Sequence, residues 1–537
     1  MSTRKNLLIA ACYSGALVLG MVLGPKFQRE NLNSRNGSFK IFQTEEDGGK
    51  VQQVLNIIRE NYVDPVKTDT LQNLAIDEIL NNLDPHSTYL PPVEARMFTD
   101  DMEGNYNGIG IEYQLLNDTL IITHINKTGP AAKAGLQSGD QVIRIENQNI
   151  AGVRITPTKI VGLIRGRQST LVELTVRRYG LHEDVVFKVP REKVTVSSID
   201  VSYLLPNKVG YIKISKFGAK TDEDFLAELR RLKKQGMQGL IMDLRGNGGG
   251  YLNAATALAD QFLSDEQLIV YTQGEHEPRT DYFATDVGDY EKGKLVVLID
   301  EGTASASEII AGALQDLDRA TIIGRRSFGK GLVQEQFNFG DGSALNLTVA
   351  RYFTPSGRSI QKPYTKGKIE YFKEISNRIK NGELVFDQKH LTDSLFATRD
   401  KYFKTVSGRV VFGGGGVMPD VYVPIDTTGH TPLYYSLSSK AVLNEFVYSY
   451  LIKKARPASL SELLAHFNLS KAQYDQLQAL AAKKKITFTL KEFDEAREVI
   501  MLDIKALLAR FYFGEDAYYR VLNETDNMIR RSLVALK

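Results

Sequence analysis

The chain has 537 residues, which is too many for one ordinary hydrophobic core, so we expect several domains. Its apolar fraction of 42% and charged fraction of 24% are those of globular proteins and exclude wholesale disorder. With 67 basic and 64 acidic residues the formal net charge is only +3, which gives no electrostatic reason to expect nucleic acid as a partner.

Residues 1–25 have the features of an export signal. Arg4 and Lys5 precede an apolar run from Leu7 to Leu23, the order found in Sec-type signals. At about 17 residues the run is just long enough to cross a bilayer as a helix, and no convincing small-residue cleavage site follows it. We therefore predict an uncleaved signal anchor that leaves the rest of the chain outside the cytoplasm, with a cleaved signal peptide as the alternative.

Cys12 is the single cysteine of the chain and lies inside this apolar run. The residues before it superficially resemble a lipoprotein processing site, but the apolar stretch continues beyond it. An ordinary small residue of a membrane helix is therefore the better interpretation. Without Cys12 the chain has no cysteine, which excludes disulfides, thiolate zinc sites and cysteine nucleophiles beyond the anchor.

The next two hundred residues change in pattern twice. Residues 26–50 are polar and resemble a tether, and residues 51–97 form an N-terminal helical region with two helices joined at Asp64-Pro65. Residues 98–190 are rich in β-branched residues and turns, with one short helix over 156–164. The strands predicted there are Ile109–Tyr113, Leu120–Ile125, Gln141–Ile145 and Leu171–Arg178.

Residues 191–428 alternate strands and helices. The run 239–244 is largely apolar, as in a buried parallel strand. A helix over 252–263, a strand over 294–299 and a helix over 305–317 follow it. This succession predicts an α/β core with right-handed crossovers. Residues 429–537 become helical again, for example over 459–467 and 491–511, and form a C-terminal helical domain.

Ser305 lies where the strand 294–299 gives way to a helix. The first N–H groups of a helix are unpaired and attract negative charge, which suits a serine that takes part in acyl transfer. Ser305 and Glu308 also fit a capping box, and from this segment alone that structural role is the better interpretation. Ser307 is the neighbouring candidate nucleophile.

A base for such a serine is not found among the histidines, because none lies in a segment that resembles a triad and no H-E-x-x-H or G-x-S-x-G motif is present. A buried lysine can replace histidine because burial lowers its pKa. Lys330 lies between two glycines among apolar residues, and Gln334 falls on the same strand face to hold its amine. Taken alone, such a Gly-Lys-Gly turn is more often a solvated loop.

A glycine-rich turn, residues 243–250, follows the buried strand 239–244. It lacks the endings of phosphate-binding loops, although helix N-termini bind anions. We interpret it as half of an oxyanion hole, in which Gly249 or Gly250 offers a backbone N–H and Ala306 offers the other.

A second glycine-rich turn carries Gly108, Ile109, Gly110 and Ile111 and leads into a predicted strand. Such a turn before an open strand edge binds the terminal carboxylate of a peptide and adds the peptide as a further strand. The turn is weak evidence alone, but the run 129–140 strengthens it.

Together these segments closely resemble the C-terminal processing peptidases, also called tail-specific proteases, over about residues 50–428. Ser305 and Lys330 stand 25 positions apart, as in that family's Ser-Lys dyad, which selects Ser305 over Ser307, and Gln334 lies four positions further on. The other matching segments are 84–87, 106–111, 129–140, 243–250, 351–361 and 415–420.

The resemblance implies an α/β fold with a crotonase-like (ClpP/crotonase-type) protease core and an inserted PDZ domain over 98–190. The residue pattern adds an N-terminal helical segment and a C-terminal helical extension, and the extension matches no part of the family pattern. It implies a serine endopeptidase with no metal, no nucleotide and no other cofactor. Its partners would be proteins or peptides with free apolar C-termini, captured by the PDZ domain, and a membrane reached through the anchor. A bacterial periplasm is the expected location, and the C-terminal helices would form a dimer contact, a lid or an adaptor surface.

Two functions of other classes compete with this one. An inert, exported PDZ scaffold would bind tails without cutting them, although Ser305, Lys330 and Gln334 are all intact. A crotonase-type acyl-CoA enzyme would share the core fold, but export from the cytoplasm and the PDZ region both argue against it.

Overall fold

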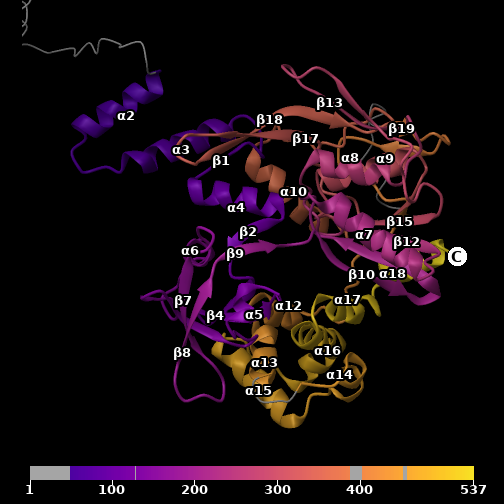
Figure 1. Ribbon diagram of the computed structural model, residues 1–537. Helices are drawn as coiled ribbons and strands as arrows, with labels where there is room; N and C mark the ends of the chain where they lie inside the picture. The colour runs from indigo at the N-terminus through magenta and orange to yellow at the C-terminus, as the bar shows by residue number, and fades with distance from the viewer. Residues whose placement is uncertain (1–48, 127, 387–401, 452–455) are drawn as a thin grey trace, which may run out of the picture. The chain divides into compact units, whose positions relative to one another are not determined.

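The computed structural model describes residues 49–126, 128–386, 402–451 and 456–537 (Figure 1). The chain divides into two compact units, residues 1–75 and 76–537. The expected signal anchor and nearly all of the tether lie outside the described residues. In the described part of the chain, no helix combines the length and the apolar character that crossing a membrane requires.

The N-terminal region is helical. Helix α2 (Lys50–Asn61) belongs to the first unit, and α3 (Thr68–Asn81) begins in it. They are separated at Asp64-Pro65 as predicted, since proline disfavours a helical residue before it. Helix α4 (Pro92–Glu103) is not among the predicted elements: Pro92 fits its first turn, and Gly104 ends it in the left-handed conformation. This continuous helix crosses the boundary predicted between residues 97 and 98.

The β-rich region forms a sheet in the order β3-β4-β5-β7-β8, with β6 paired to β5. Predicted strands match closely at β4 and β5, whereas β3 begins at residue 111 because residues 109 and 110 lie outside any strand and Gly110 has a φ of 75°. Strands β2 and β9 pair where the chain enters and leaves the region. The elements are β2 (Asn105–Gly108), β3 (Ile111–Leu116), β4 (Thr119–Ile125), α5 (Pro130–Lys133), β5 (Gln141–Ile145), β6 (Gln148–Asn149), α6 (Pro157–Ile164), β7 (Leu171–Arg177), β8 (Val185–Pro190) and β9 (Glu192–Thr195).

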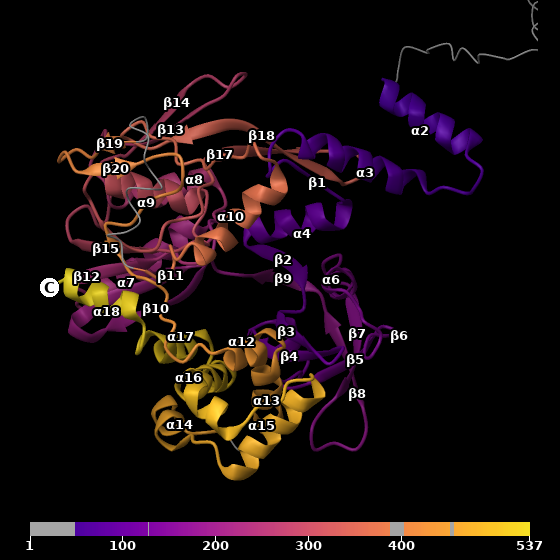
Figure 2. The same ribbon diagram turned by 180° about the vertical axis from the view of Figure 1, so that it is seen from behind.

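The α/β core is a sheet in the order β10-β11-β12-β15-β16-β21, parallel from β11 onward. Apolar residues on one face of this sheet pack against α7, α8 and α9, and those on the other face pack against α18 (Figure 2). The elements are β10 (Ile199–Leu205), η1 (Pro206–Lys208), β11 (Val209–Ile214), α7 (Thr221–Lys234), β12 (Gly239–Asp243), α8 (Leu252–Asp260), β15 (Lys294–Ile299), α9 (Ala306–Asp316), β16 (Thr321–Gly324), β21 (Val421–Tyr422) and α18 (Asn527–Ala535).

A second sheet, in the order β1-β18-β13-β14 with β17 paired to β18, has no counterpart in the sequence prediction. The elements of this sheet are β1 (Thr88–Leu90), β13 (Leu268–Gln273), β14 (Thr280–Phe283), β17 (Leu332–Asn338) and β18 (Ala344–Phe353); α10 (Lys368–Lys380), β19 (Tyr402–Lys404) and β20 (Val410–Phe412) follow it.

The C-terminal helices have a hydrophobic core of their own and contact both other regions. The Tyr448 hydroxyl donates to the Gly139 carbonyl of the β-rich region at 2.8 Å. Asn523 donates to the Tyr203 hydroxyl of β10 at 2.8 Å. The helices are α12 (Pro432–Ser439), α13 (Val442–Leu451), α14 (Leu460–His466), α15 (Lys471–Lys483), α16 (Leu490–Phe513) and α17 (Glu515–Asn523).

Candidate active site

A cleft of about 700 Å³ lies beside the N-terminal end of α9. Its walls come from α4, β17, β18, the turn after β12 and the first turn of α9. The structure therefore brings into one cleft the catalytic and oxyanion residues predicted from the sequence: Gly249, Gly250, Ser305, Ala306, Lys330 and Gln334.

Ser305 directly precedes α9 and has a strained backbone. Its φ of 56° and ψ of −119° are rare for a residue with a side chain and cost on the order of 1–3 kcal/mol. Ser305 and Glu308 stand in a capping box, in which the Ser305 N–H donates to Glu308 Oε2 at 2.9 Å, while the Ser305 side chain makes no cap hydrogen bond. Among the described residues the Ser305 hydroxyl has no hydrogen-bond partner, so it is available in the cleft.

Lys330 is held by the side chain predicted to hold it. Its Nζ donates to Gln334 Oε1 at 2.8 Å. Burial lowers the pKa of Lys330, and the negative charges of Glu308 and Asp84 oppose that shift. The amine therefore loses its proton at a lower pH than a solvated lysine, as a general base requires. Within the described chain no hydrogen bond joins Nζ to the Ser305 hydroxyl.

His86 binds Gln334. It lies in the segment 84–87 that resembles the family, but no role is predicted for it from the sequence. Its carbonyl accepts from Gln334 Nε2 at 2.8 Å, and its ring Nε2 lies 2.9 Å from the Tyr371 hydroxyl. Burial and the neighbouring Lys330 charge lower the pKa of His86 to about 3. The imidazole is therefore neutral at physiological pH.

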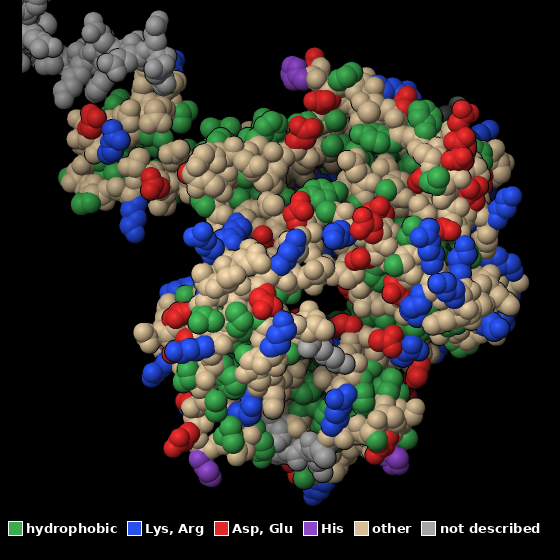
Figure 3. Space-filling view, viewed as in Figure 1, with side chains coloured by type: hydrophobic (Ala, Val, Ile, Leu, Met, Phe, Trp, Pro, Cys, Tyr) green, Lys and Arg blue, Asp and Glu red, His purple; other side chains and the backbone are tan. Residues whose placement is uncertain are grey.

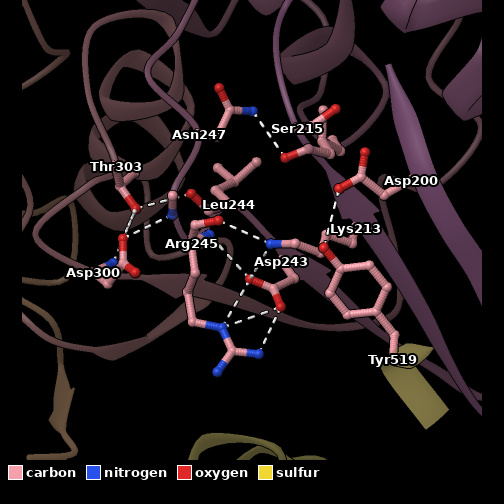
Figure 4. A network of polar contacts seen from close by, with 12 residues as sticks. Asp200, Lys213, Ser215, Asp243, Leu244, Arg245, Asn247, Asp300, Thr303 and Tyr519 are labelled. Atoms are coloured by element: carbon pink, nitrogen blue, oxygen red, sulfur yellow. Dashed lines mark hydrogen bonds and ion pairs between the residues drawn. The ribbon is translucent and has the colours of Figure 1, made fainter. Parts of the chain in front are cut away.

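The turn after β12 is held by a network of polar contacts (Figure 4). Arg245 pairs with Asp243 at 2.7 Å, and Lys213 Nζ donates to the Arg245 carbonyl at 2.8 Å. Burial by itself would raise the pKa of Asp243, but Arg245 and Lys213 hold that pKa well below its usual range. Tyr519 of α17 donates to Asp200 at 3.3 Å beside Lys213, so a C-terminal helix reaches this network.

The same turn is tied to the loop that carries Ser305. Thr303 Oγ1 donates to the Leu244 carbonyl at 2.9 Å, and Ser307 Oγ donates to the Asn247 carbonyl at 3.0 Å. Ser307 is fully buried and its hydroxyl is already engaged. The geometry therefore favours Ser305 over Ser307 as the reactive serine.

Gly249 lies against Ser305 but is not free to bind an oxyanion. A Cβ at Gly249 would lie 2.8 Å from Ser305 Cβ and 2.9 Å from the Ala306 nitrogen. Its N–H donates to Asn247 Oδ1 at 2.9 Å and is therefore already engaged in this arrangement, so its role as an oxyanion donor stays a prediction. The N–H groups of Gly250 and Ala306 have no partner among the described residues and are the remaining candidate pair.

The predicted tail-binding residues lie elsewhere in the second unit, at the turn between β2 and β3. Ile109 is fully buried in the core of the β-rich region, and Gly110 has a φ of 75°, which favours glycine. The N–H groups of Ile109 and Gly110 have no hydrogen-bond partner within the described residues. Gly108 ends β2 and Ile111 begins β3, an edge strand beside which a peptide can add.

Two side chains that contact both Ser305 and Lys330 are missing from the sequence prediction. In the sequence, Glu308 is recognised only as part of a capping box. Tyr352 lies in the segment 351–361 that resembles the family, but no role is predicted for it. In the part of the chain that the structure covers, no group of three or more His, Cys, Asp and Glu side chains is placed to hold a metal ion.

Comparisons with known proteins identify the family of the chain. The model of peptidase family S41 matches residues 208–371, a PDZ domain model matches residues 121–178, and a family of unknown function matches residues 433–514. The carboxy-terminal-processing protease of Bartonella bacilliformis is 38% identical over 310 residues, which are 57% of this chain and 70% of that protein.

Two further proteins that are similar to this chain are also named as C-terminal processing proteases. The carboxy-terminal processing protease CtpB of Bacillus subtilis is 34% identical over 58% of this chain and 65% of its own length. A solved photosystem II D1 C-terminal processing protease is 25% identical over 70% of this chain and 93% of that chain, with a TM-score of 0.35.

The chain therefore belongs to peptidase family S41, whose members are serine peptidases. Within that family it is a carboxy-terminal processing protease with a PDZ domain, and the α/β fold class predicted from the sequence is confirmed.

Proposed function

We propose that the protein is an exported endopeptidase that cuts with Ser305 as nucleophile and Lys330 as general base. One observation carries the proposal: a strained serine with an unpaired hydroxyl and a buried lysine held by Gln334 line the same cleft. Burial keeps the lysine amine neutral over more of the pH range, which a base requires.

In the proposed mechanism, neutral Lys330 takes the proton of the Ser305 hydroxyl as its oxygen attacks the scissile carbonyl. Catalytic hydrogen bonds often tighten only when substrate binds, which accommodates the missing contact between these two groups. The N–H groups of Gly250 and Ala306 stabilise the oxyanion by roughly 3–4 kcal/mol each. Lys330 then gives its proton to the leaving amine and later deprotonates the water that hydrolyses the acyl-enzyme.

Substrate selection is proposed to occur at the PDZ domain. The free N–H groups of Ile109 and Gly110 bind the terminal carboxylate, and the tail pairs with the edge of β3. A tethered substrate reaches the cleft at a high effective concentration, so tail binding raises the rate without new contacts at the serine.

The location that we propose is the periplasm of a bacterium, with the chain tethered to the inner membrane by residues 1–25. The basic residues before the apolar run support this orientation. Acidic and basic side chains are interspersed over the face seen in Figure 3, in keeping with a net charge of +3 and with protein substrates. Fractionation of cells that produce the chain, with mass spectrometry of its N-terminus, tests both location and cleavage.

The decisive experiment measures degradation of one model protein that carries either an apolar or a charged C-terminal tail. Ser305→Ala and Lys330→Ala should abolish cleavage of both, whereas the wild type should prefer the apolar tail. Ser307→Ala is the matched control and should retain most activity, since its hydroxyl bonds only to a buried carbonyl. Unchanged cleavage by Ser305→Ala would favour an inert scaffold and refute the assignment.

A further inference from the structure

Glu308 connects the proposed nucleophile to the proposed base. It lies in the first turn of α9 and is fully buried. Its Oε2 accepts from the N–H of Ser305 at 2.9 Å and from the N–H of Lys330 at 2.8 Å. Its Oε1 accepts from the N–H of Gly329 at 2.8 Å and from the Ser327 hydroxyl. One carboxylate thus holds the backbones of two residues that are 25 positions apart.

Tyr352 of β18 makes a second connection between the same two residues. Its ring is buried, and its hydroxyl lies 3.0 Å from the Ser305 carbonyl and 2.7 Å from the Lys330 carbonyl, so the two carbonyls share its single proton. Burial raises the pKa of Tyr352 well above its ordinary value, so the hydroxyl keeps its proton over the working pH range.

We propose that Glu308 and Tyr352 are a pair of positioning residues that set the approach of Ser305 to Lys330. The carboxylate acts through the two N–H groups and the phenol through the two carbonyls, and neither has to touch the substrate. The inference rests on the proposed dyad of Ser305 and Lys330 and adds the groups that align it.

The charge of Glu308 has a second effect, on the base. Burial raises the pKa of Glu308 to about 7, although its four donors oppose that shift. As pH rises through that value, the Glu308 carboxyl ionises and both of its oxygens can accept from the four donors. Below that pH the carboxyl carries a proton, so one of its oxygens is itself a donor that faces other donors. The ionised form also raises the pKa of Lys330, against the effect of burial.

Other titratable groups around this pair need to be considered in any pH profile. Those that face the carboxyl or the lysine are Lys330, Tyr352 of β18, Tyr371 and Arg378 of α10, and Asp84 and His86 before β1. Burial raises the pKa of Tyr371 and lowers that of His86 to about 3, so both are neutral near pH 7. The group among these whose charge changes near neutral pH is therefore Glu308, and the Lys330 pKa is lowered from its ordinary value.

The test compares pH profiles of kcat and KM for an apolar-tailed peptide in Glu308→Gln and Tyr352→Phe. Both variants should lower the plateau of kcat by roughly ten- to hundredfold with little change in KM, because alignment and not binding is lost. Glu308→Gln should also move the rising limb to lower pH, because the charge that raises the lysine pKa is gone. Tyr352→Phe should leave the limb in place.

The matched controls are a glutamate and a buried tyrosine outside the cleft. Glu301→Gln removes a carboxylate that pairs with Arg325 at 2.7 Å, and Tyr290→Phe removes a hydroxyl that donates to the Lys294 carbonyl at 3.2 Å. Both should keep kcat within about twofold of the wild type. Melting curves of all variants separate misalignment from unfolding.

Either of two results overturns the proposal. One is a wild-type kcat in Glu308→Gln or Tyr352→Phe, and the other is a pH profile of Glu308→Gln whose rising limb stays at the wild-type pH. If Glu308→Gln does not fold, Ser327→Ala replaces it. Loss of one donor should raise the Glu308 pKa and keep Glu308 neutral to higher pH, so the rising limb should move to lower pH as in Glu308→Gln. A limb that does not move refutes the inference. Failure of the dyad itself is seen separately, as cleavage that survives in Ser305→Ala or Lys330→Ala.

Discussion

Gly249→Ala should disable the enzyme more than it destabilises the fold. At a φ of +101° an alanine backbone costs about 1–2 kcal/mol. Its Cβ would lie 2.8 Å from both Ser305 Cβ and the Ala304 carbonyl oxygen, and 2.9 Å from the Ala306 nitrogen. Non-bonded heavy atoms prefer about 3.5 Å or more, so the serine loop must move by about 0.7 Å. A shift of that size at the nucleophile should lower kcat roughly ten- to hundredfold.

Two glycines of the same turn supply the controls. Gly246 has a φ of +70° but no atom within 4 Å of an added Cβ, and Gly248 has neither constraint. Gly246→Ala should cost about 1 kcal/mol of unfolding free energy with nearly normal activity, and Gly248→Ala should resemble the wild type. The assays are kcat/KM on a tailed peptide, the rate of acylation by a serine-directed reagent, and urea unfolding. Equal kcat/KM in Gly249→Ala and Gly246→Ala would refute the reasoning.

Three further predictions concern the ion pair between Arg245 and Asp526, the tail site and acid stability. Asp526 pairs with Arg245 at 2.5 Å and caps α18. Asp526→Ala should therefore lower the unfolding free energy by about 1–2 kcal/mol. An unchanged midpoint of urea unfolding would contradict this prediction. Gly110→Val should raise KM for apolar-tailed peptides and leave kcat unchanged, because φ is 75° there; equal KM values would count against the tail site. Burial would raise the pKa of Glu374, but arginine and lysine neighbours hold it at about 2, below its ordinary 4.5. Its contribution to stability is therefore complete above pH 4.5 and lost as pH falls towards 2, and urea titrations should show a shallower acid loss in Glu374→Gln.

Elements with strong local signals are predicted well from the sequence. The strand 294–299 is recovered with its exact bounds because a continuous apolar run is enclosed by turns, and the helix at 305–317 is recovered to within one residue at each end. Helix α4 is missed because prolines at 91 and 92 hide its start and no side chain caps it. The strands of the second sheet are missed because their formation depends on pairing with other strands and not on a local sequence pattern; these strands are β13, β14, β17 and β18.

By itself the sequence determined the class of enzyme, since Ser305, Lys330 and Gln334 stand at a spacing that chance does not produce together with the other matching segments. Tertiary structure decided which groups are available. Ser307 and the Gly249 N–H look equivalent to their neighbours in the sequence, but each already has a partner on Asn247. Hydrogen bonds between segments that are distant in the chain are set by the packing of elements, so no local pattern announces them. For the same reason Glu308, which resembles an ordinary helix cap in the sequence, is seen only in the fold to hold both Ser305 and Lys330.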